Sequence, residues 1–199
     1  MVQYQSTRGH KEKLSFEDVI LSGLAPDKGL YLPDSLTIDN LNHLTEEDLS
    51  YEDFVKTIFI ALDKNSAKYV DDLSLYSGFE NSAEPVLKDL NDTTLIMELF
   101  HGPTKSFKDY ALQPLGAIAD KRLSELGERG LVLVATSGDT GSAAIQAVKE
   151  SENIDIVVLH PADKISDYQR QQMTSVIKDN VFNIAVNGSY DDCQRIAKE

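Results

Sequence analysis

Short apolar runs alternate with helical patterns through the second half of the sequence, and this alternation is the feature that most constrains the fold. After Pro85, four runs rich in β-forming residues are each followed by a segment with helical spacing: TLIMELF, LVLVATS, IDIVVLHP and VFNIAV. Continuous apolar strands separated by helices are typical of a parallel sheet covered by helices. The sequence therefore predicts parallel-sheet α/β units from residue 86 onward.

The first 85 residues predict a mainly helical region. Ser15 with Asp18, and Ser50 with Asp53, have the spacing of helix-capping pairs, and an amphipathic pattern follows each pair. Glycine and proline residues between these helices mark turns around one short strand, GLYLP. We expect three parts: a helical region (1–85), a strand-loop-helix segment (86–128) and an α/β domain (129–199).

Two of the later predicted helices have unusual features. Pro114 lies inside an otherwise helical pattern, which predicts either a kink there or a regular helix that begins near it. Ser189 and Asp192 have capping-box spacing, and neither glycine nor proline follows before Glu199. The expectation is a chain cut inside a helix, with the α/β fold incomplete at its C-terminus.

Composition excludes several classes of function. The 199 residues carry a formal net charge of −14, which argues against nucleic acid or an anionic membrane as a partner. Cys193 is the single cysteine, so the chain alone forms no disulfide and no cysteine-based zinc site. The histidines lack HExxH spacing, and no metal is expected. The first residues do not resemble a signal peptide, so we expect a cytoplasmic protein.

The loop HGPTKSFKD, after the first apolar run, contains candidate catalytic residues. Ligands of such sheets bind beyond the carboxyl ends of the strands. Thr104 and Ser106 can donate hydrogen bonds to an anion, and Lys108 lies near the start of the next helix, beside Phe107. A helix N-terminus and an apolar wall both favour a neutral, nucleophilic amine. The alternative is an ordinary solvated lysine.

A second loop, TSGDTG, follows LVLVA and contains candidate substrate-binding residues. Its glycines permit close backbone approach to a ligand, and N–H groups at the start of the next helix suit a carboxylate or a phosphate. It lacks the Gly-Lys-Ser/Thr ending of a Walker A loop and the spacing of a nucleophile elbow. The alternative is a strand-to-helix turn capped by serine or threonine.

Taken together, these loops resemble those of threonine synthases. The resemblance rests on ELFHGPTKSFKDYALQ followed by ATSGDTGSAAI, and it extends to YQSTRG, LSFEDVILSGLAPDKGLYLP, HPADKISDYQRQQMT and GSYDDCQ. It implies a fold-type-II pyridoxal 5′-phosphate (PLP) enzyme, a carbon-oxygen lyase acting on phosphates. Members of this family convert O-phospho-L-homoserine and water to L-threonine and phosphate.

The resemblance also implies roles for individual residues. Lys108 would hold PLP as a Schiff base and later act as a base. The substrate carboxylate would bind to Ser137, Gly138, Asp139 and Thr140. Asp139 would also approach the 3′-oxygen of the cofactor. Thr104, Ser106 and Lys105 would lie near the departing phosphate.

The length of the chain leaves alternatives open. Family members are more than twice as long, and the remainder would carry the glycine-rich cup for the cofactor phosphate. We therefore expect this portion alone to be inactive. One alternative is a threonine-synthase-like phospholyase that eliminates phosphate from other amino compounds. The other is a short, non-catalytic binding or scaffold protein.

Overall fold

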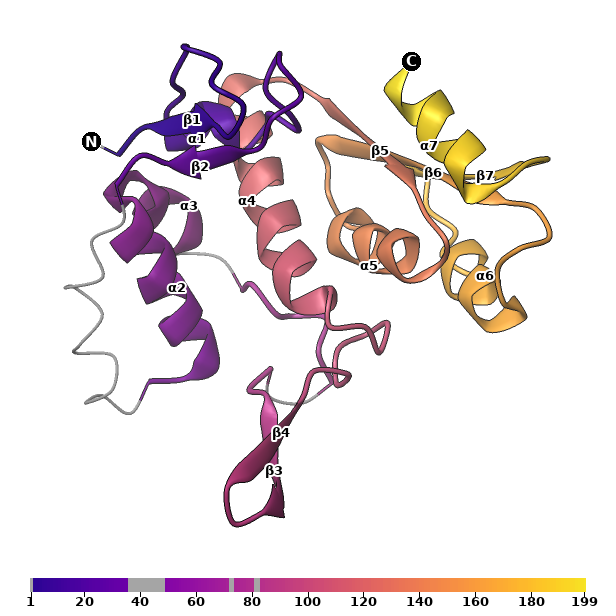
Figure 1. The fold of residues 1–199 in the computed structure, drawn as a ribbon, viewed down its shortest axis with the longest axis horizontal. Helices are drawn as coiled ribbons and strands as arrows, with labels where there is room; N and C mark the ends of the chain where they lie inside the picture. The colour runs from indigo at the N-terminus through magenta and orange to yellow at the C-terminus, as the bar shows by residue number, and fades with distance from the viewer. Residues whose placement is uncertain (1, 36–48, 72–73, 81–82) are drawn as a thin grey trace. The chain divides into compact units, whose positions relative to one another are not determined.

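The chain divides into two compact units, Met1–Leu75 and Tyr76–Glu199, whose helices and strands are labelled in Figure 1. The structure, a computed structural model, describes residues 2–35, 49–71, 74–80 and 83–199. In these parts of the chain, no helix is both long and apolar enough to cross a membrane. The three-part division at residues 85 and 128 stays a prediction.

The first unit combines short helices with a small antiparallel sheet. Strand β1 (Tyr4–Ser6) pairs with β2 (Tyr31–Pro33), which contains part of the predicted GLYLP strand. The helices are α1 (Phe16–Val19), α2 (Tyr51–Leu62), the 3-10 helix η2 (Lys64–Ser66) and α3 (Ala67–Val70). The predicted caps of α1 and α2 are confirmed, because the Ser15 and Ser50 side chains accept hydrogen bonds from backbone N–H groups.

Aromatic side chains form the core of this unit. The Phe16 ring lies between Tyr4 and Tyr69, with ring centroids 6.3 and 6.0 Å away. Tyr69 is fully buried, and Tyr4 is nearly so. Burial, and secondarily the nearby Asp63 carboxylate, raise the pKa of Tyr4 to about 12. The core is therefore most stable with this hydroxyl protonated.

A three-stranded parallel sheet organises the second unit and confirms the predicted α/β fold. Its strands are β5 (Gly130–Ala135), β6 (Ile154–Pro161) and β7 (Val181–Val186), in the order β5-β6-β7. Helices α5 (Asp139–Val148) and α6 (Asp167–Thr174) follow the first two strands and lie on one face, while α7 (Tyr190–Lys198) lies on the other (Figure 1). The predicted capping box that starts α7 is confirmed at Ser189 and Asp192.

The core of this unit lies between β6 and the helices on the α5 face. Every second residue of β6, Ile154, Ile156 and Val158, is essentially inaccessible to solvent. They pack in one cluster with Ile145 and Val148 of α5, Met173 of α6 and Leu123 of α4 (Asp109–Leu126). Burial of β6 explains why its sequence is a continuous apolar run. The sheet thereby fixes the loops at its carboxyl edge.

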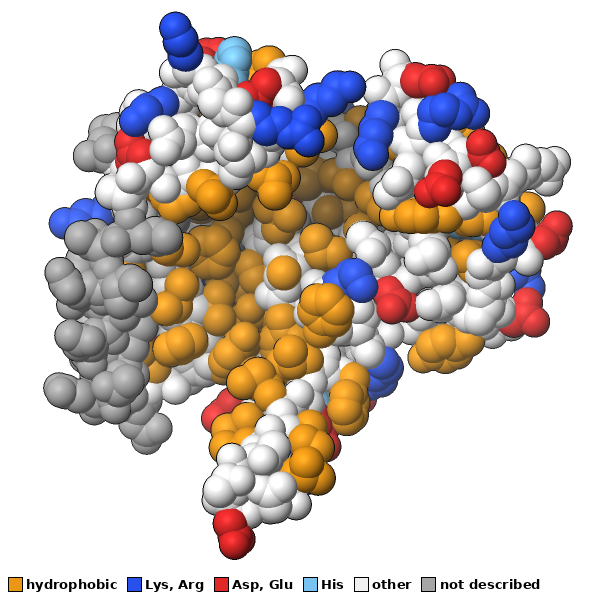
Figure 2. All heavy atoms as spheres, viewed as in Figure 1, with side chains coloured by type: hydrophobic (Ala, Val, Ile, Leu, Met, Phe, Trp, Pro, Cys, Tyr) orange, Lys and Arg blue, Asp and Glu red, His pale blue; other side chains and the backbone are white. Residues whose placement is uncertain are grey.

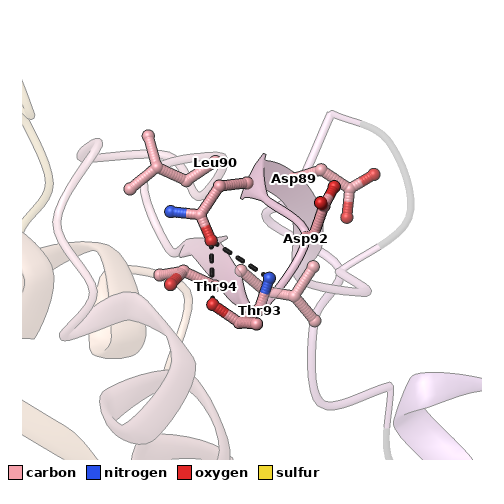
Figure 3. A pocket seen from close by; sticks show the side chains of 7 residues that line it. Asp89, Leu90, Asp92, Thr93 and Thr94 are labelled. Carbon is pink, nitrogen blue, oxygen red and sulfur yellow. Dashed lines mark hydrogen bonds between the residues drawn. The ribbon is translucent and has the colours of Figure 1, made fainter.

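The first of the four predicted strands does not join this sheet. Strand β4 (Thr94–Glu98) instead pairs antiparallel with β3 (Val86–Asn91). The tight turn between them is stabilised locally, because Asn91 Oδ1 accepts hydrogen bonds of 3.0 Å from both the N–H and the hydroxyl of Thr93 (Figure 3). The prediction that TLIMELF belongs to the parallel sheet is therefore wrong, because the strand pairs with the segment just before it in a local hairpin.

The β3–β4 hairpin exposes apolar side chains, some of which are visible in Figure 2. The exposed residues are Val86, Leu87, Leu90, Leu95, Ile96 and Met97. A hollow of about 580 Å³ beside the turn is lined only by residues 89–95, and none of the predicted site residues contributes to it (Figure 3). The hollow follows from the shape of the hairpin, and the candidate site lies elsewhere in the unit.

Helix α4 runs through Pro114 from a start at Asp109, so a regular helix that begins near Pro114 is ruled out. Proline has no N–H, and Pro114 cannot donate to the carbonyl of Tyr110 one turn earlier. The Tyr76 hydroxyl donates to that carbonyl instead, at 3.0 Å. A side chain from outside the helix thus replaces the hydrogen bond that proline removes.

We expect Tyr76→Phe to lower the free energy of unfolding by about 1 kcal/mol, the net value of one hydrogen bond. The loss should shrink in a Pro114→Ala background, because the introduced alanine N–H can bond the Tyr110 carbonyl itself. Urea unfolding of the wild type, both single variants and the double variant measures this coupling. An equal loss in both backgrounds would contradict the replacement of one donor by the other.

Candidate active site

The loop that carries Lys108 is a series of turns between β4 and α4. The Lys105 N–H donates to the Gly102 carbonyl at 3.1 Å, and the Asp109 N–H donates to the Ser106 carbonyl at 3.1 Å. Lys105 has a positive φ of 62°, which tightens the first turn. As a result, Lys108 lies at the N-cap position of α4, immediately before its first residue.

Asp109 anchors this loop from inside the protein. Its side chain is fully buried, and its two oxygens accept hydrogen bonds from the backbone N–H of Thr104 (2.9 Å) and from the Thr104 hydroxyl (2.8 Å). A side chain at position 102 would collide with Asp109, so Gly102 is required at this turn. Burial raises the pKa of Asp109, and the bonds from Thr104 oppose part of that increase.

We expect Asp109→Asn to remove a pH dependence of stability and Asp109→Ala to destabilise the loop. A carboxyl with a raised pKa stabilises the fold below its unfolded pKa, and this contribution is lost as pH rises through its folded value. Asparagine avoids that loss and can still bond Thr104, whereas alanine leaves the buried Thr104 N–H unpaired and should cost about 1 to 3 kcal/mol.

Urea unfolding between acidic and neutral pH compares the wild type with both Asp109 variants. The stability of Asp109→Asn relative to wild type should increase as pH rises. A difference that is constant with pH would contradict the raised pKa. Equal stability of the asparagine and alanine variants would contradict the anchoring role.

The loop between β5 and α5 is built around Thr136. The buried Thr136 hydroxyl accepts hydrogen bonds from the N–H groups of Gly138 (2.9 Å) and Gly141 (3.0 Å). Gly138 has a φ of 142°, a conformation that side chains disfavour. Asp139 and Thr140 are the first residues of α5 and are exposed, so the positive end of the helix dipole opens to solvent here.

The structure brings these two loops together at Lys108 and Asp139. Lys108 Nζ lies 4.0 Å from Asp139 Oδ2 and 4.7 Å from the centroid of the Phe107 ring. The lysine side chain is 28% exposed, so the amine is partly covered and still reachable. A primary amine, a carboxylate and a helix N-terminus therefore share one site.

Helix α6 contacts both loops through two glutamines. The Gln169 amide donates to Asp139 Oδ1 at 2.7 Å, and the Gln172 amide donates to the Thr104 carbonyl at 2.9 Å. Sequence reasoning did not select these residues. The signal was their spacing of three in a helix whose N-cap is Ser166, which places both on one helix face.

Comparisons with known proteins show what this chain is similar to. A family model described as the threonine synthase N terminus matches residues 3–70. The threonine synthase of Pseudomonas aeruginosa is 42% identical over 99% of this chain and 43% of its own length. The solved structure of a PLP-bound threonine synthase from Brucella melitensis is similar to this chain, with a TM-score of 0.88 and 36% identity. The similarity covers 100% of this chain and 44% of the Brucella chain.

The chain corresponds to the N-terminal part of threonine synthases. The threonine synthase from yeast agrees, with a TM-score of 0.84 and 33% identity over 99% of this chain and 43% of its own. A threonine synthase-like 2 protein of Xenopus laevis is 36% identical over 96% of this chain and 42% of its own length. The chain thus spans less than half the length of the relatives it matches.

The predicted threonine synthase residues differ in how the structure places them. Lys108, Ser137, Asp139 and Thr140 are wholly or partly accessible, whereas Thr104, Ser106 and Gly138 are buried. The Thr104 and Ser106 hydroxyls bond within their own loop, since Ser106 Oγ accepts from the Lys108 N–H at 3.3 Å. The roles of all seven residues stay predictions.

The two histidines at strand ends have hydrogen-bonding partners. His101 Nε2 lies 2.9 Å from Glu98 Oε2, and His160 Nδ1 lies 3.3 Å from the Pro161 carbonyl. His160 is within β6 itself, and His101 is in the lysine loop. Over the described ranges, no three His, Cys, Asp or Glu side chains form a group that could hold a metal ion.

Proposed function

We propose that the full-length protein is a cytoplasmic, PLP-dependent threonine synthase that converts O-phospho-L-homoserine and water to L-threonine and phosphate. The observation that carries the proposal is the placement of Lys108 Nζ 4.0 Å from Asp139 Oδ2, where the lysine loop meets the N-terminus of α5. The similarity to a PLP-bound threonine synthase over the whole chain supports it.

The lysine site fits an aldehyde cofactor. Lys108 presents a partly exposed primary amine, which is the group that condenses with the aldehyde of PLP. The Phe107 ring beside the amine provides an apolar wall, and Asp139 provides a carboxylate. When bound, PLP supplies an electron sink that stabilises negative charge at the substrate α-carbon.

The residues of this chain would then bind substrate and move protons. Lys108, once released, is the base that takes the α-proton onto Nζ. The N–H groups at the start of α5, with Ser137, Gly138, Asp139 and Thr140, would hold the substrate carboxylate. Thr104, Ser106 and Lys105 would lie toward the phosphate. The Thr104 hydroxyl would have to exchange its bond to Asp109 in order to donate to the phosphate, whereas the Ser106 hydroxyl accepts its present bond and can still donate.

Incubation of the full-length protein with PLP and O-phospho-L-homoserine tests the proposal. We expect release of phosphate and threonine in equal amounts, together with a visible absorbance band from the bound cofactor. A protein that stays colourless with PLP and forms no threonine would defeat the proposal.

A second candidate is a phospholyase that eliminates phosphate from a different amino compound. The observation that favours this candidate is the 36% identity between this chain and a threonine synthase-like 2 protein. The same assay with other phosphorylated amino alcohols separates the two functions. Phosphate release without threonine from O-phospho-L-homoserine, and faster release from another substrate, would identify the phospholyase.

A further inference from the structure

We propose that Gln169 and Gln172 of α6 are positioning residues. They hold the substrate loop (TSGDTG) and the lysine loop (HGPTKSFKD) in fixed positions relative to each other. The inference rests on the proposed function, because it concerns the same Lys108–Asp139 site. Gln169 donates to Asp139, which lies beside Lys108, and Gln172 donates to Thr104, which bonds the residue that follows Lys108.

Gln169 has both ends of its amide engaged. It lies at the third position of α6, where Ser166 Oγ accepts from its backbone N–H at 3.2 Å and donates to its side-chain oxygen Oε1 at 3.1 Å. With the oxygen held by Ser166, Nε2 points to Asp139 Oδ1 at 2.7 Å. The other Asp139 oxygen faces Lys108 Nζ. The helix cap therefore sets the orientation of the carboxylate beside the lysine.

The absence of a side chain at Gly138 makes this contact possible. A Cβ built on Gly138 would collide with the amide of Gln169. The glutamine amide thus packs directly over the backbone of the loop that carries Asp139. This close packing fixes the loop in addition to the hydrogen bond.

Gln172 acts on the other loop in the same way. One turn after Gln169, its Nε2 donates to the Thr104 carbonyl at 2.9 Å and contacts the Tyr168 hydroxyl at 3.3 Å. Thr104 is bonded in turn to the buried Asp109, the residue after Lys108. These hydrogen bonds connect α6 to the start of α4, and none of their donors is charged.

A neutral amide has a specific advantage at Asp139. It holds the carboxylate in place and leaves it negatively charged, so the carboxylate can still act on the amine of Lys108. A cation in the same place would compete with Lys108 for the carboxylate. We therefore expect a negative charge placed at this position to alter the interaction between Asp139 and Lys108 as well as its geometry.

Gln169→Glu separates positioning from helix capping. Glutamate at this position retains the capping interaction with Ser166 but cannot donate to Asp139, whose charge it repels. Gln171→Glu is the matched control, because it adds the same charge to an exposed position on the same helix. Gln172→Met tests the second contact by removing the amide at similar size.

The measurements use the PLP-loaded, full-length protein. We expect Gln169→Glu to lower kcat on the order of 10²-fold, as a small displacement of catalytic groups can do. It should also shift the pH midpoint of the visible cofactor band, with thermal stability close to that of Gln171→Glu. Gln172→Met should lower kcat, because the loop that carries Lys108 would lose its hydrogen bond to α6.

The outcomes distinguish this inference from the proposed function. If Gln169→Glu and Gln172→Met match Gln171→Glu in kcat and in pH midpoint, the positioning role is overturned and the threonine synthase proposal stands. If the wild type binds no PLP and makes no threonine, the proposed function fails instead. A loss of folding in Gln169→Glu alone, with Gln172→Met unchanged in kcat, would also overturn the inference, because capping would then be the only role.

Discussion

Lys108→Ala should abolish threonine formation by the full-length protein and remove its visible cofactor band. The variant lacks the amine that condenses with PLP and the base that takes the α-proton, so kcat should fall by at least about 10³-fold. Phosphate release from O-phospho-L-homoserine and the absorbance spectrum with added PLP measure both effects.

Two further measurements make the assignment to Lys108 specific. Lys88→Ala is the control, since Lys88 lies on the exposed strand β3 and outside both loops. Borohydride reduction of the wild type, followed by peptide mapping, should place the pyridoxyl label on Lys108. A label on a different lysine, or a visible band that survives in Lys108→Ala, would overturn the site.

The parallel sheet could be predicted because its sequence signal is physical and local. Strand β6 is covered on both faces, so nearly every position must be apolar, and the run IDIVVLHP reflects that requirement. The caps at Ser15, Ser50 and Ser189 were predictable for a similar reason, since each bond spans three residues.

The β3–β4 hairpin was missed because its apolar residues have no buried face in this chain. Leu87 and Leu95 are more than half exposed, so the alternation of buried and exposed positions is absent. The signal that decides the pairing is the turn at Asn91 and Thr93, which lacks the common Asn-Gly or Asp-Gly sequence of a tight hairpin. Apolar content alone could not separate it from a sheet strand.

The two candidate loops were predictable one at a time, but their meeting was not. Glycine, serine and threonine at strand ends mark each loop, whereas the 4.0 Å separation of Lys108 and Asp139 depends on how α4 and α5 pack. Gly116 of α4 lies against the Ala147 backbone, where any larger residue would collide. The glutamines of α6 were missed because their spacing of three places them on one helix face but does not show what that face contacts.

Gly138→Ala should damage both the stability of the protein and the geometry of the substrate loop. The residue has a φ of 142°, so alanine would bear backbone strain of about 1 to 3 kcal/mol. Its methyl group would also collide with the Gln169 amide and displace the donor that holds Asp139. We expect lower stability and a fall in kcat on the order of 10²-fold from the shifted carboxylate.

Gly127→Ala is the matched control, because it separates strain from collision. Gly127 also has a positive φ, 67°, at the end of α4, but a methyl group there would meet nothing within 4 Å. Gly127→Ala should lower the free energy of unfolding by about 1 kcal/mol and leave kcat unchanged. In a Gln169→Ala background, Gly138→Ala should lose the part of its stability cost that comes from collision and keep the part that comes from backbone strain. Urea unfolding and kcat are measured for each of these variants. If Gly138→Ala lowers the free energy of unfolding and kcat no more than Gly127→Ala does, the substrate loop tolerates displacement of Gln169.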